Sequence, residues 1–309
     1  MSRLLRRTVA AASLIFAANP VSQALAHAVC GDRVFPATLI MDDPGVGDEL
    51  SLPTIQYTPL PAAGGNPSGQ IVDYGYEWDK TITKDLGFAI NGDYLTQYGA
   101  GHNLRGWDNI TVTLKDELPC SEVDEFMVSV GVIRDFAGTG SSQLLRAGAI
   151  ETVSNTAPTL YAGKGLGDLP IGSFRPFAVT GELGYVVSDS QRLSPNQWAY
   201  AASLQYSIPY LQQHVKALDM PAFFTRLVPL VEVSFSQPPN GPAIGTISPG
   251  VLYEATAWQA GIEAIIPANA ATRQIQGTGF LVQFHLFLDD LFPQSIGKPL
   301  IDTDLWGQR

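Results

Sequence analysis

The stretch Val72-Asp73-Tyr74-Gly75-Tyr76-Glu77-Trp78-Asp79 alternates apolar or aromatic side chains with polar or small ones at every step. Successive side chains of a β-strand point to opposite faces, so this period of two predicts a strand with one apolar and one polar face. The chain also contains 30 glycines and 22 prolines. Breaks of this frequency favour many short strands and turns over a helical bundle.

The same alternation recurs along most of the chain. About ten stretches carry it clearly. They centre on residues 70–79, 86–94, 110–114, 126–132, 177–185, 198–206, 231–235, 248–255, 258–266 and 280–286. Weaker stretches at 147–153 and 159–162 would raise the number to about twelve, and bacterial single-chain barrels favour even counts. The sequence therefore predicts an all-β fold, an antiparallel transmembrane β-barrel of about 12 strands, within a range of about 10 to 14.

A soluble β-sandwich would alternate in the same way and stays as the alternative fold. Two features favour the membrane barrel. Aromatic residues gather near the ends of the expected strands, as the interfacial girdles of membrane barrels do. The polar faces carry many carboxylates, amides and hydroxyls, and these suit a water-filled lumen better than a dry core.

Residues 1–26 have the pattern of a secretory signal peptide. Three arginines precede an apolar run at residues 9–18, and the small residues at 24–26 offer a cleavage site after Ala26, with Ala28 as the alternative. The apolar run is too short for a membrane helix of about 20 residues. We therefore expect export from the cytoplasm.

The rest of the chain divides into three expected segments. Residues 27–69 are rich in proline and alternate little, which predicts an irregular N-terminal segment outside the barrel wall; residues 70–292 form the barrel, and 293–309 a C-terminal tail. Cys30 and Cys120 are the two cysteines, and in an oxidising compartment they could form a disulfide or stay apart. The acidic stretch 41–49 could bind a hard cation, but it lacks the ligand spacing of a calcium loop, so a solvated turn is favoured.

Charged and polar residues on the expected inward positions are the candidate lining of the lumen. They are Asp73, Glu77, Asp79, Asp85, Asp93, Lys115, Arg134, Glu182, Glu232, Glu254, Glu263 and His285. Carboxylates dominate this set, so an open lumen would favour cations over anions. The alternative is that these groups bond to one another across a closed, plugged interior.

The sequence offers little support for catalysis. His285 is the histidine found on an expected strand, and no Gly-x-Ser-x-Gly motif accompanies it. We expect it to bond to a neighbouring carboxylate such as Glu263 on the preceding strand. No catalytic residue, cofactor or metal site is predicted.

Net charge narrows the partners. The chain carries a formal charge of −11, and removal of the three arginines of residues 1–26 would bring it to −14. A strongly acidic chain is a poor ligand for nucleic acid. The expected partners are outer-membrane lipid, the outer-membrane assembly machinery and a small-molecule or ion solute.

The segment Lys164-Gly165-Leu166-Gly167-Asp168-Leu169-Pro170, with the expected strand at 176–187 after it, resembles the phenol-degradation (MetA) pathway outer-membrane transporter family. The resemblance extends over residues 70–292. It implies an outer-membrane channel or transporter for small molecules, among them apolar or aromatic compounds, and it supplies no catalytic residues. The alternative is a non-transporting outer-membrane or periplasmic β-protein with a binding or structural role. About twenty residues follow Leu288, which departs from the terminal aromatic strand usual in barrels.

Overall fold

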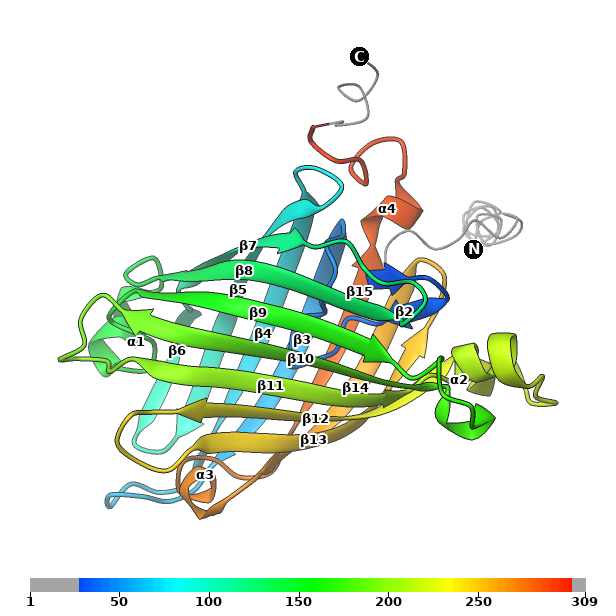
Figure 1. The fold of residues 1–309 in the computed structure, drawn as a ribbon. Coiled ribbons are helices and arrows are strands. Elements are labelled where there is room, and N and C mark those ends of the chain that lie inside the picture. The colour runs from blue at the N-terminus through cyan, green and yellow to red at the C-terminus, as the bar shows by residue number, and fades with distance from the viewer. Residues whose placement is uncertain (1–27, 302–309) are drawn as a thin grey trace, which may run out of the picture.

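Twelve antiparallel wall strands close into a barrel in the computed structural model, which describes residues 28–301 (Figure 1). The strands are β3 (Glu49–Leu60), β4 (Gly69–Thr81), β5 (Leu86–Gly99), β6 (His102–Trp107), β7 (Ile110–Glu117), β8 (Phe126–Phe136), β9 (Asn155–Gly165), β10 (Phe177–Ser188), β11 (Gln197–Tyr206), β12 (Leu227–Gln237), β13 (Ile244–Glu254), β14 (Trp258–Pro267) and β15 (Gly279–Phe287). β6 and β7 pair with different ends of β5 and together act as one wall strand. The predicted signal peptide lies outside the described residues.

The predicted fold class and strand number are confirmed, but two members differ from the expectation. β3 belongs to the wall and pairs with both β4 and β15, so the barrel begins at Glu49 and the expected start at Gln70 was wrong by one strand. The stretch 147–153 forms no strand, whereas 159–162 lies in β9. A bulge explains why β3 escaped notice: Ser51 pairs with Glu77 but Thr54 with Gly75, so the inward positions change from odd to even numbers.

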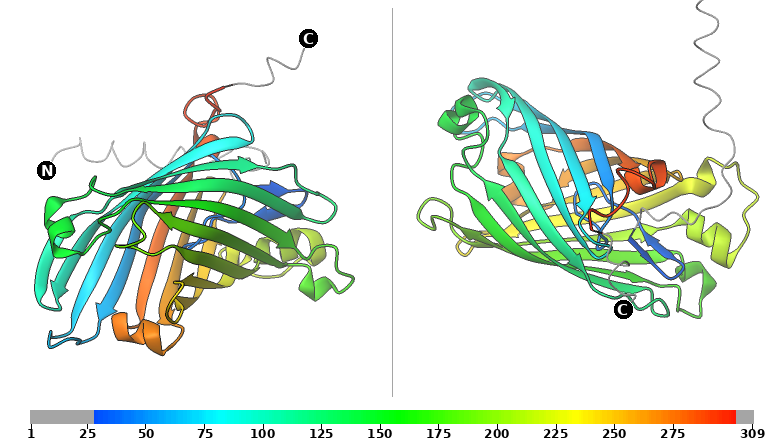
Figure 2. Two further views of the ribbon diagram at one scale, coloured as in Figure 1. Left: turned by 60° about the vertical axis from the view of Figure 1, so that its left-hand side comes forward. Right: turned by 90° about the horizontal axis from the view of Figure 1, so that it is seen from above.

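The chain enters and leaves the barrel at one end, which we call the terminal end (Figures 1 and 2). The short hairpin of β1 (Ala28–Cys30) and β2 (Arg33–Phe35) lies at this end. So do η1 (Gly172–Phe174), α2 (Ile208–Tyr210), η2 (Leu211–Val215), η3 (Phe224–Arg226) and α4 (Leu288–Leu291). The opposite end carries α1 (Ser142–Ala147) and α3 (Ala270–Ile275).

No helix within residues 28–301 is long and apolar enough to cross a bilayer.

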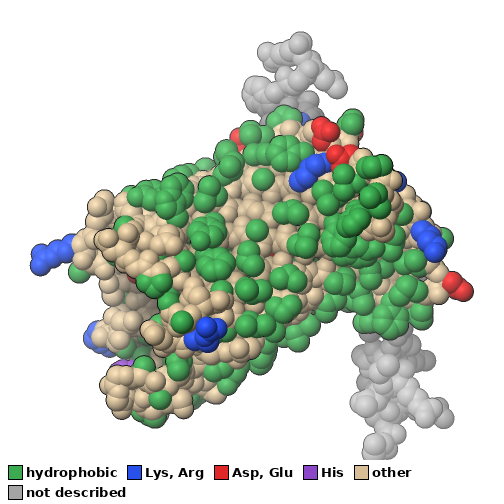
Figure 3. Space-filling view, turned by 60° about the horizontal axis from the view of Figure 1, so that its bottom comes forward, with side chains coloured by type: hydrophobic (Ala, Val, Ile, Leu, Met, Phe, Trp, Pro, Cys, Tyr) green, Lys and Arg blue, Asp and Glu red, His purple; other side chains and the backbone are tan. Residues whose placement is uncertain are grey.

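The outer face of the wall is apolar. Figure 3 shows hydrophobic side chains spread over one side of the barrel, with charged side chains mostly toward its margins. Outward residues such as Leu114, Val132 and Ile262 are each about half exposed, at 47%, 45% and 52%. Aromatic pairs mark both ends, with Tyr185–Trp198 near the opposite end and Phe177–Tyr206 near the terminal end. This surface suits lipid contact.

Candidate functional site

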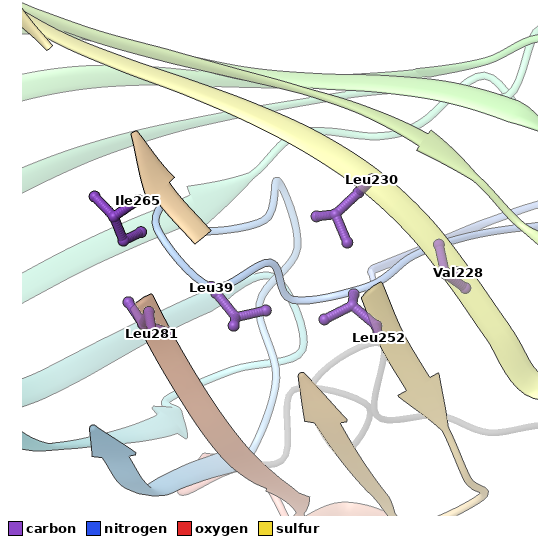
Figure 4. Packing of buried hydrophobic residues seen from close by; sticks show 6 residues of the cluster. All are labelled: Leu39, Val228, Leu230, Leu252, Ile265 and Leu281. Atoms are coloured by element: carbon purple, nitrogen blue, oxygen red, sulfur yellow. The ribbon is translucent and has the colours of Figure 1, made fainter. Parts of the chain in front are cut away.

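Residues 28–48, which we call the plug, lie inside the barrel at its terminal end. Leu39 packs in a cluster with five apolar side chains from β12–β15, shown in Figure 4. These are Val228, Leu230, Leu252, Ile265 and Leu281. On the same side of the lumen, the Gln259 side-chain amide of β14 donates to the Ala37 carbonyl at 2.6 Å. On the other side, the Ser129 hydroxyl of β8 donates to the Pro44 carbonyl. Because β8 and β14 lie across the ring of strands from each other, the plug spans the lumen.

One disulfide and one buried ion pair anchor the plug. Cys30 and Cys120, 90 residues apart in sequence, form a disulfide that joins the β1–β2 hairpin to the β7–β8 turn. The fully buried guanidinium of Arg33 donates to Glu125 at 2.9 Å and lies 3.8 Å from the ring centroid of Tyr210. Burial raises the pKa of the Tyr210 hydroxyl, and its hydrogen bond to Glu125 adds to this rise. Tyr210 therefore stays a donor, and the buried Glu125 carboxylate is well satisfied.

The plug leaves a cavity of about 430 Å³ between itself and the inner face of β3, β4, β5, β7 and β15. Seven carboxyl groups face this space: Asp42, Asp43, Glu49, Glu77, Asp79, Asp93 and Glu182. A second cavity of about 260 Å³ lies nearer the opposite end and includes Asp135 in its lining. Ile133 and Glu182 line both cavities, so the two spaces adjoin. The two adjoining cavities, which we call the acidic chamber, lie inside the barrel beside the plug.

Basic groups offset part of this charge. Lys115 reaches from β7 to the plug and donates to Asp42 at 2.6 Å and to the Asp43 carbonyl at 3.0 Å. Lys80 donates to Asp48 at 2.5 Å, at the terminal edge of the plug. The acidic stretch 41–49 was expected to be a solvated turn, and this was wrong. It is held inside the barrel because the wall supplies lysines and the hydroxyl of Thr81 as partners.

The expected lining residues divide into three groups in the structure. Glu77, Asp79, Asp93, Lys115, Glu182 and His285 line the larger cavity, and Asp73 occupies an inward position beside them on β4. Glu232, Glu254 and Glu263 also occupy inward positions, but Glu232 and Glu263 are sealed beneath the plug, with 0% and 1% exposure. Asp85 and Arg134 do not face the lumen.

The predicted inward placement of Arg134 was wrong. Arg134 shares its face of β8 with Val130 and Val132, which are exposed on the outer surface, and it pairs with Asp189 at 2.6 Å. The period of two already placed it outward, and Asp135 next to it is the inward residue. The hydrogen bond from Arg134 lowers the pKa of Asp189.

The predicted lumen position of Asp85 was also wrong. The turn between β4 and β5 contains Asp85, whose side chain is 53% exposed and lies 3.7 Å from Lys84. The amides of Ile82 and Thr83 both donate to the Leu86 carbonyl, which closes the turn one residue beyond Asp85. The alternation therefore begins after this residue.

His285 takes part in a hydrogen-bonded chain that sequence reasoning missed. Its Nδ1 lies 2.7 Å from the Ser51 hydroxyl, and its Nε2 lies 2.6 Å from Oε2 of Glu49. The expected partner Glu263 was wrong, because Glu263 pairs with Leu281, which lies four residues before His285 on β15. Recognition of β3 as a strand would have revealed the chain, since Ser51 and His285 are direct cross-strand partners.

A serine, a histidine and a carboxylate in a row also occur in acyl-transfer enzymes, but the surroundings oppose that chemistry. Acyl transfer develops negative charge on a substrate oxygen and needs donors aimed at it. The cavity beside Ser51 instead presents the carboxyl groups of Asp43, Glu77 and Asp79. The hydrogen bonds of His285 with Ser51 and Glu49 link β15 to β3, the last wall strand to the first.

The opposite end is narrowed by apolar packing. Leu144 of α1 is fully buried and packs with Leu95 and Ile150, with Ile71 and Leu104 at the edge of the cluster. Leu95 and Leu104 lie on adjacent strands β5 and β6, so the β8–β9 loop folds inward over this side of the mouth. Across residues 28–301, three or more His, Cys, Asp or Glu side chains never gather in the geometry of a metal site.

Comparisons with known proteins find similarity in fold but not in sequence. No protein-family model matches the sequence, and no curated protein matches it. The structure is similar to one described as the COG4313 outer membrane channel from Pseudomonas putida F1, with a TM-score of 0.51 and 12% identity over 82% of this chain and 99% of that chain. Lower scores of 0.44 and 0.46 relate it to the KdgM porin (11% identity, 75% and 98% coverage) and the NanC porin (8% identity, 76% and 98%).

At these identities, the likeness establishes the outer-membrane type of barrel fold and nothing finer. The resemblance of residues 164–170 to the phenol-degradation (MetA) pathway family stays a prediction.

Proposed function

We propose that this protein is an outer-membrane channel or transporter for small solutes, and that its lumen favours cations. One observation carries the proposal: the two adjoining cavities inside the barrel form an acidic space beside the plug. Lys115 and His285 engage the carboxyl groups of Asp42 and Glu49. The carboxyl groups that remain for a passing ion are those of Asp43, Glu77, Asp79, Asp93 and Glu182. Rings of carboxyl groups favour cations.

The same lining supports a proposal for the class of solute. The resemblance to the MetA-pathway family suggested apolar or aromatic compounds, and the smaller cavity offers such molecules the apolar side chains of Ile133, Val186 and Ala199. The larger cavity, however, is lined by seven carboxyl groups. Small cations or cationic organic molecules fit an acidic chamber of this size better. In this proposal, the protein is exported through its signal peptide, inserted by the outer-membrane assembly machinery, and surrounded by lipid along its apolar outer face.

A specific observation favours a second candidate, a non-transporting outer-membrane β-protein with a binding or structural role. The plug spans the lumen and is fixed by a disulfide and a buried ion pair. If the plug never moves, the acidic chamber is a binding pocket open toward one side only. The two candidates differ in whether ions cross the barrel.

Heat-modifiable migration of protein from fractionated outer membranes tests the location, since an intact barrel migrates differently before and after boiling. Reversal potentials in planar bilayers under a KCl gradient then test transport. We expect conductance with preference for potassium over chloride. Absence of conductance in both the native protein and a variant with a released plug would favour the non-transporting barrel, and a preference for chloride would overturn the cation proposal.

A further inference from the structure

Six buried side-chain oxygens on the inner face of β11–β14 receive no hydrogen bond from a donor within residues 28–301. One is Oε1 of Gln259, and the other five belong to neighbouring residues. They are the hydroxyl oxygens of Ser203 and Ser248, Oε1 of Glu232, and both carboxyl oxygens of Glu263. The four residues are between 0% and 1% exposed. Buried polar atoms are normally satisfied, and each unsatisfied one costs about 1–3 kcal/mol. Five in one place indicate a missing partner.

Strand register brings these oxygens together. Ser203 of β11 pairs with Glu232 of β12, and Glu232 pairs with Ser248 of β13, so the three side chains form a row on one face. Direct cross-strand neighbours have Cβ atoms about 4.5–5.5 Å apart. From β14, the carboxyl group of Glu263 comes within hydrogen-bonding reach of Glu232.

A glycine makes room for that approach. Glu263 is the cross-strand partner of Gly250, and a Cβ atom added at Gly250 would lie 2.3 Å from Cγ of Glu263. The Glu263 side chain therefore lies across β13 at Gly250, where no side chain blocks it. Gly250 thus gives the carboxyl group of Glu263 a path toward Glu232.

The charge of the cluster has no protein counterpart. None of the ion pairs within residues 28–301 includes Glu232 or Glu263. Two ionised carboxylates buried side by side are strongly unfavourable unless a proton or a cation lies between them. Either species would also supply the partner that the unsatisfied oxygens lack.

We propose that Glu232, Glu263 and a hydroxyl of Ser203 or Ser248 form a buried binding site for a divalent cation, Ca²⁺ by donor type and number. All donors are oxygens, which selects a hard cation over zinc or copper. Ser203 and Ser248 lie on either side of Glu232, two strand spacings apart, so one hydroxyl joins the carboxyl oxygens at the ion. With water completing the shell, these oxygens match the six to eight ligands of calcium, whereas magnesium requires a stricter octahedron and keeps several waters. Two carboxylates match the double positive charge.

The site would act on the plug. Oε2 of Glu232 accepts hydrogen bonds from the backbone amides of Leu39 at 3.1 Å and Ile40 at 3.2 Å. A cation at Oε1 holds Glu232 ionised and leaves Oε2 as an acceptor for both amides. Calcium therefore fastens the plug to the side of the lumen where Leu39 packs, independently of whether solutes cross the barrel.

Equilibrium dialysis of the purified, full-length folded barrel against radioactive Ca²⁺ tests the site. We expect one saturable equivalent, with a dissociation constant on the order of 10⁻⁴ M, the range of extracellular calcium sites. The isosteric Glu263→Gln variant should lose this equivalent, whereas Glu254→Gln, an inward carboxyl on β13 outside the cluster, should retain it. Heat-modifiable migration verifies that each variant is folded.

Infrared spectroscopy separates the cation from a shared proton. The carbonyl stretch of a protonated carboxyl group should be present without calcium and disappear when Ca²⁺ is added to the native protein. Persistence of that band at saturating Ca²⁺, absence of a saturable equivalent, or equal calcium binding by Glu263→Gln would each overturn the proposal. Displacement of Ca²⁺ by an equal concentration of Mg²⁺ would overturn the assignment to calcium.

Discussion

The two sides of the lumen contain similar acidic residues in different environments. On the side of β3–β7, Glu77, Asp79 and Asp93 face an open chamber. On the side of β11–β14, Glu232 and Glu263 lie sealed under the plug next to an apolar cluster. The wall alternates in the same way on both sides, so the difference comes from the plug. An inward carboxylate thus either faces the cavity or is buried in contact with the plug, depending on whether the plug covers it.

Release of the plug should have the largest effect on the difference between the two sides of the lumen. We expect the triple variant Cys30→Ser, Cys120→Ser and Arg33→Ala to increase single-channel conductance severalfold, because both anchors of the β1–β2 hairpin are lost. Loss of Arg33 alone leaves Glu125 buried without its cation and should destabilise the protein by about 3–5 kcal/mol. Loss of a disulfide that closes a loop of this length adds roughly 4–5 kcal/mol in the chain-entropy model.

Single-channel recording and urea denaturation measure these two effects. Lys84→Ala removes an exposed ion pair in the β4–β5 turn and serves as the control, with little expected change. Unchanged conductance in the folded triple variant would mean that the plug is held by its other contacts alone.

Truncation of Leu39 should loosen the sealed side selectively. Leu39→Ala truncates the plug residue that packs in the apolar cluster of β12–β15, and it should lower the free energy of unfolding by about 2–5 kcal/mol. Hydrogen exchange at the amides of Leu39 and Ile40 should accelerate, because their bonds to Glu232 depend on this packing. Val123→Ala, at a position 87% exposed, is the matched control and should change nothing. Protection that survives Leu39→Ala would show that the hydrogen bonds from Leu39 and Ile40 to Glu232 do not depend on this packing.

Neutralisation of Glu182 should act on the open side. Glu182 lines both cavities, so Glu182→Gln should reduce the ratio of cation to anion permeability a few-fold, since a unit charge about 4 Å away contributes about 1 kcal/mol in water. Reversal potentials at low salt measure the change. Asp116→Asn, on the outward face next to Lys115, is the control. An equal shift in both variants would mean that overall charge, and not the lining, sets selectivity.

Arg134 should have the smallest effect, because it lies on the outer face. Arg134→Gln should leave permeability ratios unchanged. The hydrogen bond from Arg134 lowers the pKa of Asp189, so this pair stabilises the fold above the ordinary carboxyl pKa of 3.8, and the contribution is lost as pH falls through the lowered folded value. Acid unfolding curves of native and Arg134→Gln protein should therefore converge at low pH. A change in selectivity would place Arg134 in the solute path after all.

Local pattern predicted the wall well and the interior poorly. The strands from β4 to β15 are apolar toward lipid and mostly polar toward the lumen, and this rule is visible in a period of two. The inward apolar residues of β12–β15 are exceptions, and they pack against the plug. β3 obeys the rule on both sides of its bulge, but the shift of parity between Ser51 and Thr54 hides it. Arg134 was misplaced although its parity with Val132 gave the right answer.

The sequence by itself determined that the chain is a membrane-type barrel of about twelve strands, because alternation is a local property that each strand repeats. Tertiary structure alone decided that residues 28–48 enter the lumen, that Ser51 meets His285, and that Glu263 meets Glu232 across Gly250. These contacts join residues far apart in the chain, and the plug has no period of its own. Its place is set by wall partners such as Lys115 and Leu230, which only the closed barrel brings together.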